Sequence, residues 1–316
     1  MSDAPPVETR GLVKRYGEIV AVDHVDLSVE RGDVFGYLGP NGAGKTTSLR
    51  IMLGLIRPTE GWARLFGRDP LLEGAKALDG VAGFVEAPRF YPYLSGRRNL
   101  RLLADYDEPV SRGRIEDVLE LVELRDRAKD RVGGYSHGMR QRLGIAAALL
   151  REPRLLLLDE PTTGLDPAGM RDMRDLVRRL AGEGITILLS SHLLYEVEEL
   201  CNRVAIIRTG RIVYQGTLRD LLATAASGYR LRAVEPERAR TVALAQAGIG
   251  DVQLLDGELR FTADEDAVAA LTVALGRAGV GFTALVTEAA SLEELFLGMT
   301  GGESSDHDRV TEAVAV

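Results

Sequence analysis

Eight residues early in the chain combine glycines, one lysine and one hydroxyl at a fixed spacing. Residues 39–46 read Gly-Pro-Asn-Gly-Ala-Gly-Lys-Thr, which satisfies G-x-x-x-x-G-K-T. Glycines let backbone N–H groups turn toward phosphates, the Lys45 ammonium can reach the β- and γ-phosphates, and the Thr46 hydroxyl can hold Mg²⁺. We therefore expect a nucleotide-phosphate site made by Gly39, Pro40, Asn41, Gly42, Ala43, Gly44, Lys45, Thr46 and Thr47.

The flanking sequence has the order that such a loop requires. The apolar stretch Asp33–Leu38 is typical of a strand, and Thr47–Leu53 has the composition of a helix. Lysine is rare in this arginine-rich chain, so the lysine at position 45 stands out. A glycine-rich turn that contains a lysine by chance is the structural alternative, and the strand–loop–helix order argues against it.

Two carboxylates follow a second apolar strand. The run of four leucines at 155–158 leads directly into Asp159 and Glu160, at the strand end where open α/β sheets bind ligands. Asp159 would hold Mg²⁺ through its water shell, and Glu160 would orient or deprotonate the water that attacks the γ-phosphate. A solvated strand end is the alternative, and the phosphate loop makes the acidic half of a nucleotide site the better interpretation.

A third segment, between these two, reads Tyr-Ser-His-Gly-Met over residues 135–139 and precedes a helical pattern. It resembles the signature of ABC transporter ATP-binding subunits. The family signature, typically L-S-G-G-Q, opens a helix whose N-terminus caps the γ-phosphate bound to the opposite subunit. Ser136 and Gly138 match it, whereas Tyr135, His137 and Met139 depart from it. A plain serine N-cap is the alternative.

The resemblance covers about the first 220 residues and implies roles for three further side chains. Tyr16 matches the aromatic residue that stacks on adenine, and Asp166 matches an aspartate that reaches across the dimer. His192, after the strand-like residues 185–191, matches the switch histidine that contacts the γ-phosphate. The family implies ATP and Mg²⁺ as cofactors, an α/β P-loop NTPase fold, a second ATP-binding subunit that makes a homodimer, and integral membrane permease subunits.

Glu86 occupies a position where the family usually has glutamine. That glutamine touches Mg²⁺ or the attacking water, and its loop receives the transmembrane partner. The local sequence VEAPRFYPYLSGRRNL resembles the bacitracin-resistance branch of the ABC exporters, in which glutamate is usual. The resemblance implies that Glu86 is a metal and nucleotide ligand, and a solvated loop acid is the alternative.

The composition argues against several other classes of protein. The chain has 316 residues and a formal net charge of −8, which argues against binding to nucleic acid phosphates. Its start lacks the pattern of a secretory signal, and no apolar run is long enough to cross a bilayer. The single cysteine, Cys201, is expected to be a buried packing residue. We expect a cytoplasmic protein that is held at the inner face of the membrane by its permease.

The periodicity predicts two domains and a tail. Residues 1–226 form the ATP-binding domain, with a helical insertion at about 88–150. Residues 227–300 have the element order βαββαβ, which predicts a small ferredoxin-like α+β domain with an Asp-Gly hairpin and a capping box that begins at Ser291. Residues 301–316 are expected to be disordered.

The function predicted from these features is ATP hydrolysis that powers export of a drug, antibiotic or lipid-like cargo. One alternative is a soluble ABC ATPase that acts on nucleic acid or ribosomes, which generally shows a tandem cassette, zinc cysteines or basic arms. A second alternative is a non-hydrolysing regulatory subunit, and the intact Glu160 argues against it. The cargo cannot be predicted, because its pocket belongs to another polypeptide.

Overall fold

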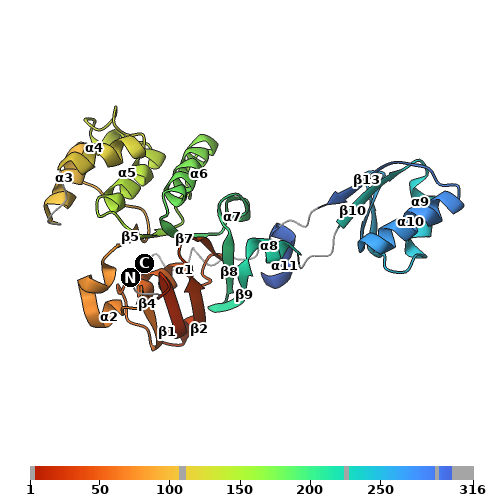
Figure 1. The fold of residues 1–316 in the computed structure, drawn as a ribbon, viewed down its shortest axis with the longest axis horizontal. Helices are drawn as coiled ribbons and strands as arrows, with labels where there is room; N and C mark the ends of the chain where they lie inside the picture. Colours follow the sequence, from red (N-terminus) through yellow and green to blue (C-terminus); the bar gives the residue numbers. More distant parts are fainter. Residues whose placement is uncertain (1–3, 107–111, 224–227, 289–291, 301–316) are drawn as a thin grey trace, which may run out of the picture. The chain divides into compact units, whose positions relative to one another are not determined.

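The computed structural model describes residues 4–106, 112–223, 228–288 and 292–300 (Figure 1). The chain divides into two compact units, Met1–Leu218 and Arg219–Val316. The sequence prediction placed this boundary after residue 226. The helix α8 (Leu218–Ala223) lies at the junction.

A six-stranded sheet forms the centre of the first unit. In spatial order its strands are β5 (Val81–Phe84), β6 (Leu155–Asp159), β7 (Thr186–Ser191), β3 (Val34–Leu38), β8 (Arg203–Arg208) and β9 (Arg211–Thr217). The first five are parallel and β9 is antiparallel to β8. Every residue of β3, β6 and β7 is buried, which explains the mostly apolar sequences of β3 and β6, whereas β7 also buries Thr186, Ser190 and Ser191. The α/β class that the sequence predicts is confirmed.

A smaller antiparallel sheet completes the nucleotide-binding core. It consists of β2 (Ile19–Val29), β1 (Val7–Tyr16) and β4 (Glu60–Leu65), in that order. Helix α1 (Lys45–Met52) contacts strands of both sheets and buries Leu49, Ile51 and Met52 in their shared core. The phosphate loop is therefore anchored to a helix that is packed on two sides.

Helices α3 (Gly96–Tyr106), α4 (Arg112–Leu121) and α5 (His137–Leu149) make up the region between β5 and β6. They contact one another, and α5 also contacts β5 and α6 (Pro167–Gly182) (Figure 1). The short elements before them are α2 (Pro70–Glu73) and a 3₁₀ turn (Gly74–Leu78), and a second 3₁₀ turn (Val132–Gly134) precedes α5. The helical insertion expected at residues 88–150 corresponds to this region.

Helix α7 (Leu194–Leu200) follows β7 and ends beside Cys201. The Cys201 side chain is buried, and burial raises the pKa of its thiol. A buried thiol of raised pKa is a poor nucleophile, in agreement with the packing role predicted for it.

The second unit has one antiparallel sheet. Its elements are β10 (Gly228–Ala233), α9 (Pro236–Leu244), β11 (Gly250–Leu255), β12 (Glu258–Thr262), α10 (Glu265–Arg277) and β13 (Phe282–Glu288), with the spatial order β11-β12-β10-β13. The order along the chain is βαββαβ, as the sequence indicates. Asp256 and Gly257 both have positive φ in the two-residue turn between β11 and β12, which is the geometry that an Asp-Gly hairpin favours. Assignment to the ferredoxin-like folds stays a prediction.

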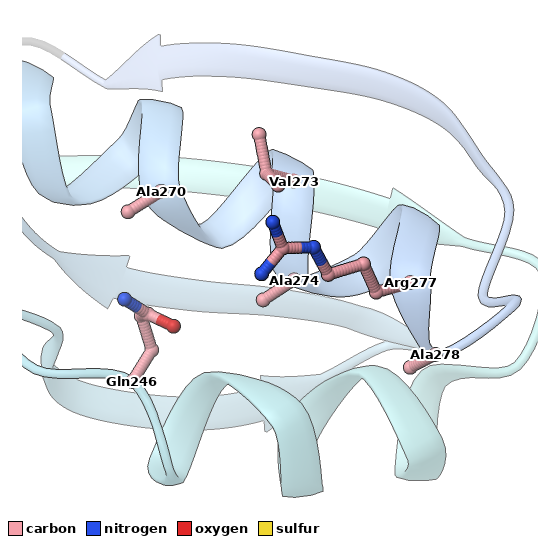
Figure 2. Close-up of a pocket in the computed structure, with 6 residues that line it drawn as sticks. All are labelled: Gln246, Ala270, Val273, Ala274, Arg277 and Ala278. Atoms are coloured by element: carbon pink, nitrogen blue, oxygen red, sulfur yellow. The ribbon is translucent and has the colours of Figure 1, made fainter.

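Residues of helix α10 line a hollow of about 560 Å³ in the second unit. Figure 2 shows Val273, Ala274 and Arg277 of α10 around it, with Gln246 across from them. A further helix, α11 (Leu292–Thr300), follows β13. Ser291, where the predicted capping box begins, and residues 301–316 lie outside the described residues. None of the helices formed by the described residues has both the length and the apolar character needed to cross a bilayer.

Candidate nucleotide-binding site

The phosphate loop connects β3 to α1 and depends on glycine at several positions. Gly42 and Gly44 have φ values of 79° and 105°, which other residues rarely adopt. A Cβ atom at Gly44 would lie 2.3 Å from the carbonyl oxygen of Ala21, and one at Gly39 would lie 2.5 Å from that of Ile207. Neighbouring backbone therefore excludes any side chain at these two glycines.

The loop leads directly into α1, and the first turn of this helix forms part of the site. Lys45, Thr46 and Thr47 are the first three residues of the helix, and N-terminal N–H groups have no partner within a helix. Gly44 provides no side-chain cap, and the first turn contains no acidic residue. This helix end is consequently suited to an anion such as a phosphate.

The Lys45 side chain is buried and its ammonium points into the loop. Its Nζ atom donates hydrogen bonds to the carbonyl oxygens of Gly39, at 2.7 Å, and Pro40, at 3.2 Å. The same atom lies 3.3 Å from Oε1 of Glu160. The structure thus brings the lysine of one motif into contact with the carboxylate of another.

Glu160 follows the last residue of β6 with a positive φ of 45°. Its backbone N–H donates to the carbonyl oxygen and to Oγ of Ser190, at 3.2 and 3.0 Å, which fixes this strained residue to β7. Its Oε2 atom accepts a hydrogen bond from the Thr163 hydroxyl at 2.8 Å and lies 3.0 Å from Nδ1 of His192. Glu160 is therefore contacted by Lys45, Thr163 and His192 at once.

These contacts set the protonation of Glu160. Burial raises the pKa of its carboxyl, but the Thr163 hydrogen bond and the charges of Lys45 and His192 outweigh burial, so that the pKa lies below its ordinary value. The carboxylate is ionised at neutral pH. It is in the state that a general base needs.

Asp159 is buried beside Glu160 and is held by the neighbouring strand. The Ser190 hydroxyl donates a 2.6 Å hydrogen bond to Oδ1 of Asp159, and these two residues are also partners in the β6–β7 pairing. Thr46 supplies a half-buried hydroxyl at the start of α1. A carboxylate and a hydroxyl are the hard oxygen donors that Mg²⁺ prefers, so the residues present fit this ion.

Three supporting residues were missed by the sequence reasoning. Ser190 binds both Asp159 and the backbone of Glu160, and Thr163 binds the Glu160 carboxylate. Glu196 is buried on α7, accepts a hydrogen bond from the Thr162 hydroxyl, and has a pKa that burial raises. In the sequence, two features could have pointed to these residues: the two serines directly before His192 and the acid four residues after it.

The signature segment and the loop after Glu160 pack together within one chain. Ser136 caps α5 by accepting a 3.2 Å hydrogen bond from the Met139 N–H, and Nε2 of His137 lies 3.1 Å from the Thr163 carbonyl oxygen. Asp166 caps α6 through the Gly169 N–H at 2.9 Å. Ser136 is therefore the N-cap of α5. This capping does not prevent a contact between Ser136 and a phosphate.

The structure does not bring the signature residues to the phosphate loop of the same chain. Among the described residues, no hydrogen bond or ion pair joins Ser136 or Gly138 to Lys45 or Glu160. A Cβ atom built at Gly138 meets only Leu165, at 3.5 Å. That these two residues bind the phosphate held by a second subunit stays a prediction.

Tyr16 lies at the end of β1 with its ring 48% exposed. The Lys14 ammonium is 5.0 Å from the ring centroid, which is a cation–π distance. An exposed aromatic face of this kind can accept a base, and adenine stacking on Tyr16 stays a prediction.

Glu86 follows β5 and also has a positive φ, of 68°. Its carboxylate is paired with the guanidinium of Arg50 on α1, and its side chain is largely exposed. The structure therefore connects Glu86 to the phosphate-loop helix, and in the described part of the chain no hydrogen bond joins it to Asp159. Its role as a ligand of Mg²⁺ or nucleotide stays a prediction.

Known proteins resemble this chain in sequence and in fold. The family described as ABC transporter matches residues 22–163. The uncharacterized ABC transporter ATP-binding protein YhcH of Bacillus subtilis (strain 168) is 37% identical over 300 residues, covering 93% of this chain and 96% of the relative. The chain belongs to the ATP-binding subunits of ABC transporters. The bacitracin transport ATP-binding protein BcrA of Bacillus licheniformis is 46% identical over 208 residues, covering 66% of this chain and 68% of the relative.

Other relatives of this ABC ATP-binding subunit include a drug-resistance ATP-binding protein and solved ATP-binding cassettes. The daunorubicin/doxorubicin resistance ATP-binding protein DrrA of Streptomyces peucetius is 37% identical and covers 98% of this chain and 96% of its own. A solved ATP-binding subunit of an ABC transporter has a TM-score of 0.61 at 30% identity and covers 69% of this chain and 92% of its own. The cassette MJ0796, solved as a post-hydrolysis dimer bound to ADP and Pi, has a TM-score of 0.61 at 26% identity and covers 67% and 99%. The similarity to the bacitracin branch that Glu86 and its neighbours indicate is confirmed.

Proposed function

We propose that two copies of this ABC subunit bind ATP and Mg²⁺ between them and hydrolyse the ATP to drive export through separate membrane subunits. The observation that carries the proposal is the convergence of Lys45, Glu160 and His192 at the ends of β3, β6 and β7. These residues come from three separate parts of the chain. Their contacts match the roles that hydrolysis of a γ-phosphate needs.

Each residue has a distinct part in the reaction. The α1 N-terminus and Lys45 hold the β- and γ-phosphates. Glu160 accepts a proton from the attacking water, whose oxygen forms a bond to the γ-phosphorus while the bond to the bridging oxygen breaks and ADP leaves with that electron pair. His192 exchanges its contact with Glu160 for one with the γ-phosphate. Thr46 and Asp159 would hold Mg²⁺, and the ion would supply positive charge against the phosphates.

The second subunit would complete the site. Ser136 and Gly138 stand at the start of α5, where helix N–H groups favour an anion, and within the described residues no hydrogen bond or ion pair joins them to the phosphate loop of their own chain. The dimer of the related cassette with ADP and Pi supports a site shared by two copies. Closure on ATP and reopening after hydrolysis would provide the two states that drive a permease.

The cargo class follows from the relatives. The relatives include proteins named for bacitracin transport and for daunorubicin/doxorubicin resistance. We infer export of an amphiphilic antibiotic, drug or lipid-like compound from the inner face of the membrane. The acidic chain, with a net charge of −8, gives no support to the alternative of a nucleic acid or ribosome partner.

Hydrolysis by the purified chain tests the proposal. We expect phosphate release from ATP that requires Mg²⁺ and stops when the ion is chelated. Glu160→Gln is the matched control, since it keeps the shape of the side chain and removes the base. Absence of ATP binding by the folded wild-type chain would contradict the proposal.

A further inference from the structure

His137 stands inside the signature segment at a position where the family typically has glycine. It is the first residue of α5, directly after Ser136, and its imidazole is half-buried. Because glycine has no side chain, this ring is a group that the usual signature lacks. The reaction described above gives the ring no part, although it contacts the loop that follows the general base.

The imidazole contacts the exposed middle of the loop after β6. Thr163 and Gly164 are exposed there, whereas Thr162 and Leu165 on either side are buried. Nε2 of His137 lies 3.1 Å from the Thr163 carbonyl oxygen, and Nε2 is the donor because a carbonyl oxygen only accepts. The ring edge also faces Gly164, where a Cβ atom would lie 3.6 Å from Nε2. His137 therefore holds the part of the loop that is not packed in the core.

Thr163 in turn contacts the general base. Its hydroxyl donates a 2.8 Å hydrogen bond to Oε2 of Glu160, and its N–H donates to the Glu160 carbonyl oxygen at 3.2 Å. These two bonds join both the side chain and the backbone of Glu160 to one residue. A shift of the Thr163 backbone would consequently move the hydroxyl that orients the Glu160 carboxylate.

Of the contacts that described side chains make with the Glu160 carboxylate, the one from Thr163 is the contact that the proposed reaction leaves in place. Lys45 lies 3.3 Å from Oε1, and its ammonium holds the phosphates once ATP is bound. His192 lies 3.0 Å from Oε2 and exchanges this contact for the γ-phosphate. The orientation of the base during attack by water therefore depends on Thr163, and small displacements of a catalytic group lower rates strongly.

We propose that His137 is a positioning residue for hydrolysis: its hydrogen bond to Thr163 holds the Glu160 carboxylate where it accepts a proton from the attacking water. This inference rests on the proposed function, since it takes Glu160 as the general base. It adds a residue that contacts neither ATP nor the water and acts through Thr163.

Two amide substitutions at His137 test this role. The amide nitrogen of glutamine is as many bonds from Cα as Nε2 of histidine, so His137→Gln keeps a donor for the Thr163 carbonyl oxygen. The amide nitrogen of His137→Asn corresponds to Nδ1 and does not reach that oxygen. We expect kcat for ATP hydrolysis to fall roughly tenfold in His137→Asn and to stay within about twofold in His137→Gln. The Kd for ATP should be unchanged in both, because the phosphate loop is untouched, and thermal unfolding checks the fold.

Two double variants distinguish a positioning role from other roles of this residue. Thr163→Val removes the hydroxyl that donates to Glu160, so His137→Asn/Thr163→Val should lose no more kcat than Thr163→Val alone. In His137→Asn/Glu160→Gln, the ATP-bound dimer should form as it does in Glu160→Gln, because His137 acts on the base and not on the phosphate of the partner.

The outcomes separate this inference from the proposed function. Losses of kcat that multiply in His137→Asn/Thr163→Val, or a dimer that is lost only when His137→Asn is added to Glu160→Gln, would overturn the positioning role. A normal kcat for His137→Asn in a hydrolysing wild-type background would overturn this inference alone. Absence of hydrolysis by the wild type would overturn the proposed function and this inference with it.

Discussion

The guanidinium of Arg50 is paired with the carboxylate of Glu86, so the phosphate-loop helix α1 is connected directly to the segment that follows β5. Arg50 lies on the last turn of α1, whose first turn forms the phosphate site. Glu86 lies five residues before Tyr91, the first of the two exposed tyrosines Tyr91 and Tyr93. A change at one end of this connection can therefore reach the other without a direct contact between Glu86 and Mg²⁺.

This pair predicts that Glu86→Gln affects coupling more than basal hydrolysis. The amide keeps the shape but loses the charge that attracts Arg50, so ATP hydrolysis stimulated by the permease and transport should fall several-fold. Basal hydrolysis by the isolated subunit should stay within about twofold. Both rates should be measured for the wild type, Glu86→Gln and Arg50→Gln, with and without the membrane subunit. Equal losses in the two conditions would place Glu86 in the hydrolytic site instead.

Lys45→Ala should abolish ATP binding and leave the fold intact. The Lys45 ammonium is the cation held inside the phosphate loop, by the carbonyl oxygens of Gly39 and Pro40. Calorimetric titration with ATP measures the affinity, and circular dichroism checks the fold. Lys76→Ala, at an exposed lysine, is the matched control and should bind like the wild type. Undiminished affinity in a folded Lys45→Ala variant would refute the assignment of the phosphate site.

The two roles of Ser136 can be separated by two substitutions. Ser136→Ala removes the cap of α5 and should lower the free energy of unfolding by about 1 kcal/mol. Ser136→Asp keeps an acceptor for the Met139 N–H but directs a negative charge at the proposed phosphate of the partner. This variant should be as stable as the wild type in thermal unfolding and fail to hydrolyse ATP. Normal turnover by a stable Ser136→Asp chain would exclude a phosphate contact at this residue.

Glu196 predicts a pH-dependent contribution to stability. Burial raises its pKa above the ordinary value of 4.5, so the folded protein holds the proton more tightly than the unfolded chain does. This contribution is fully present below the ordinary pKa and is lost as the pH rises through the raised pKa. Glu196→Gln, which is always neutral, should therefore be more stable than the wild type at pH 7.5.

Thermal unfolding at several pH values measures this difference. The advantage of Glu196→Gln should shrink as the pH falls toward 4.5, because the wild-type carboxyl becomes protonated. Thr162→Val, which removes the hydroxyl that donates to Glu196, is the companion variant and should destabilise the chain at neutral pH. A constant difference between wild type and Glu196→Gln across the pH range would contradict a raised pKa.

The sequence predicted the elements whose local pattern is strong. The glycine loop, the run of leucines before Asp159 and the serine before α5 each have a spacing that only a few structures satisfy, and the structure places them at a strand–helix turn, a strand end and a helix cap. The Asp-Gly turn between β11 and β12 is a similar case, because both residues must adopt positive φ.

The sequence could not show which side chains meet across the sheet. The contacts of Glu160 with Lys45 and of Asp159 with Ser190 join residues more than 30 positions apart, and they follow from strand order, which no local pattern encodes. The Arg50–Glu86 pair is of the same kind. The partner of Glu86 in the structure lies on α1, whereas the sequence suggested Mg²⁺, the attacking water or the permease as its partner.

The central claim is that Glu160 is the general base of a site completed by a second copy of the chain. Glu160→Gln keeps the contact with Thr163 and removes the base, so ATP should bind, hydrolysis should stop and the ATP-bound dimer should accumulate. Size-exclusion chromatography with light scattering, performed with Mg-ATP, measures this directly. The account predicts a dimer for Glu160→Gln with ATP and a monomer without nucleotide. A monomer that turns over ATP at the wild-type rate would contradict it.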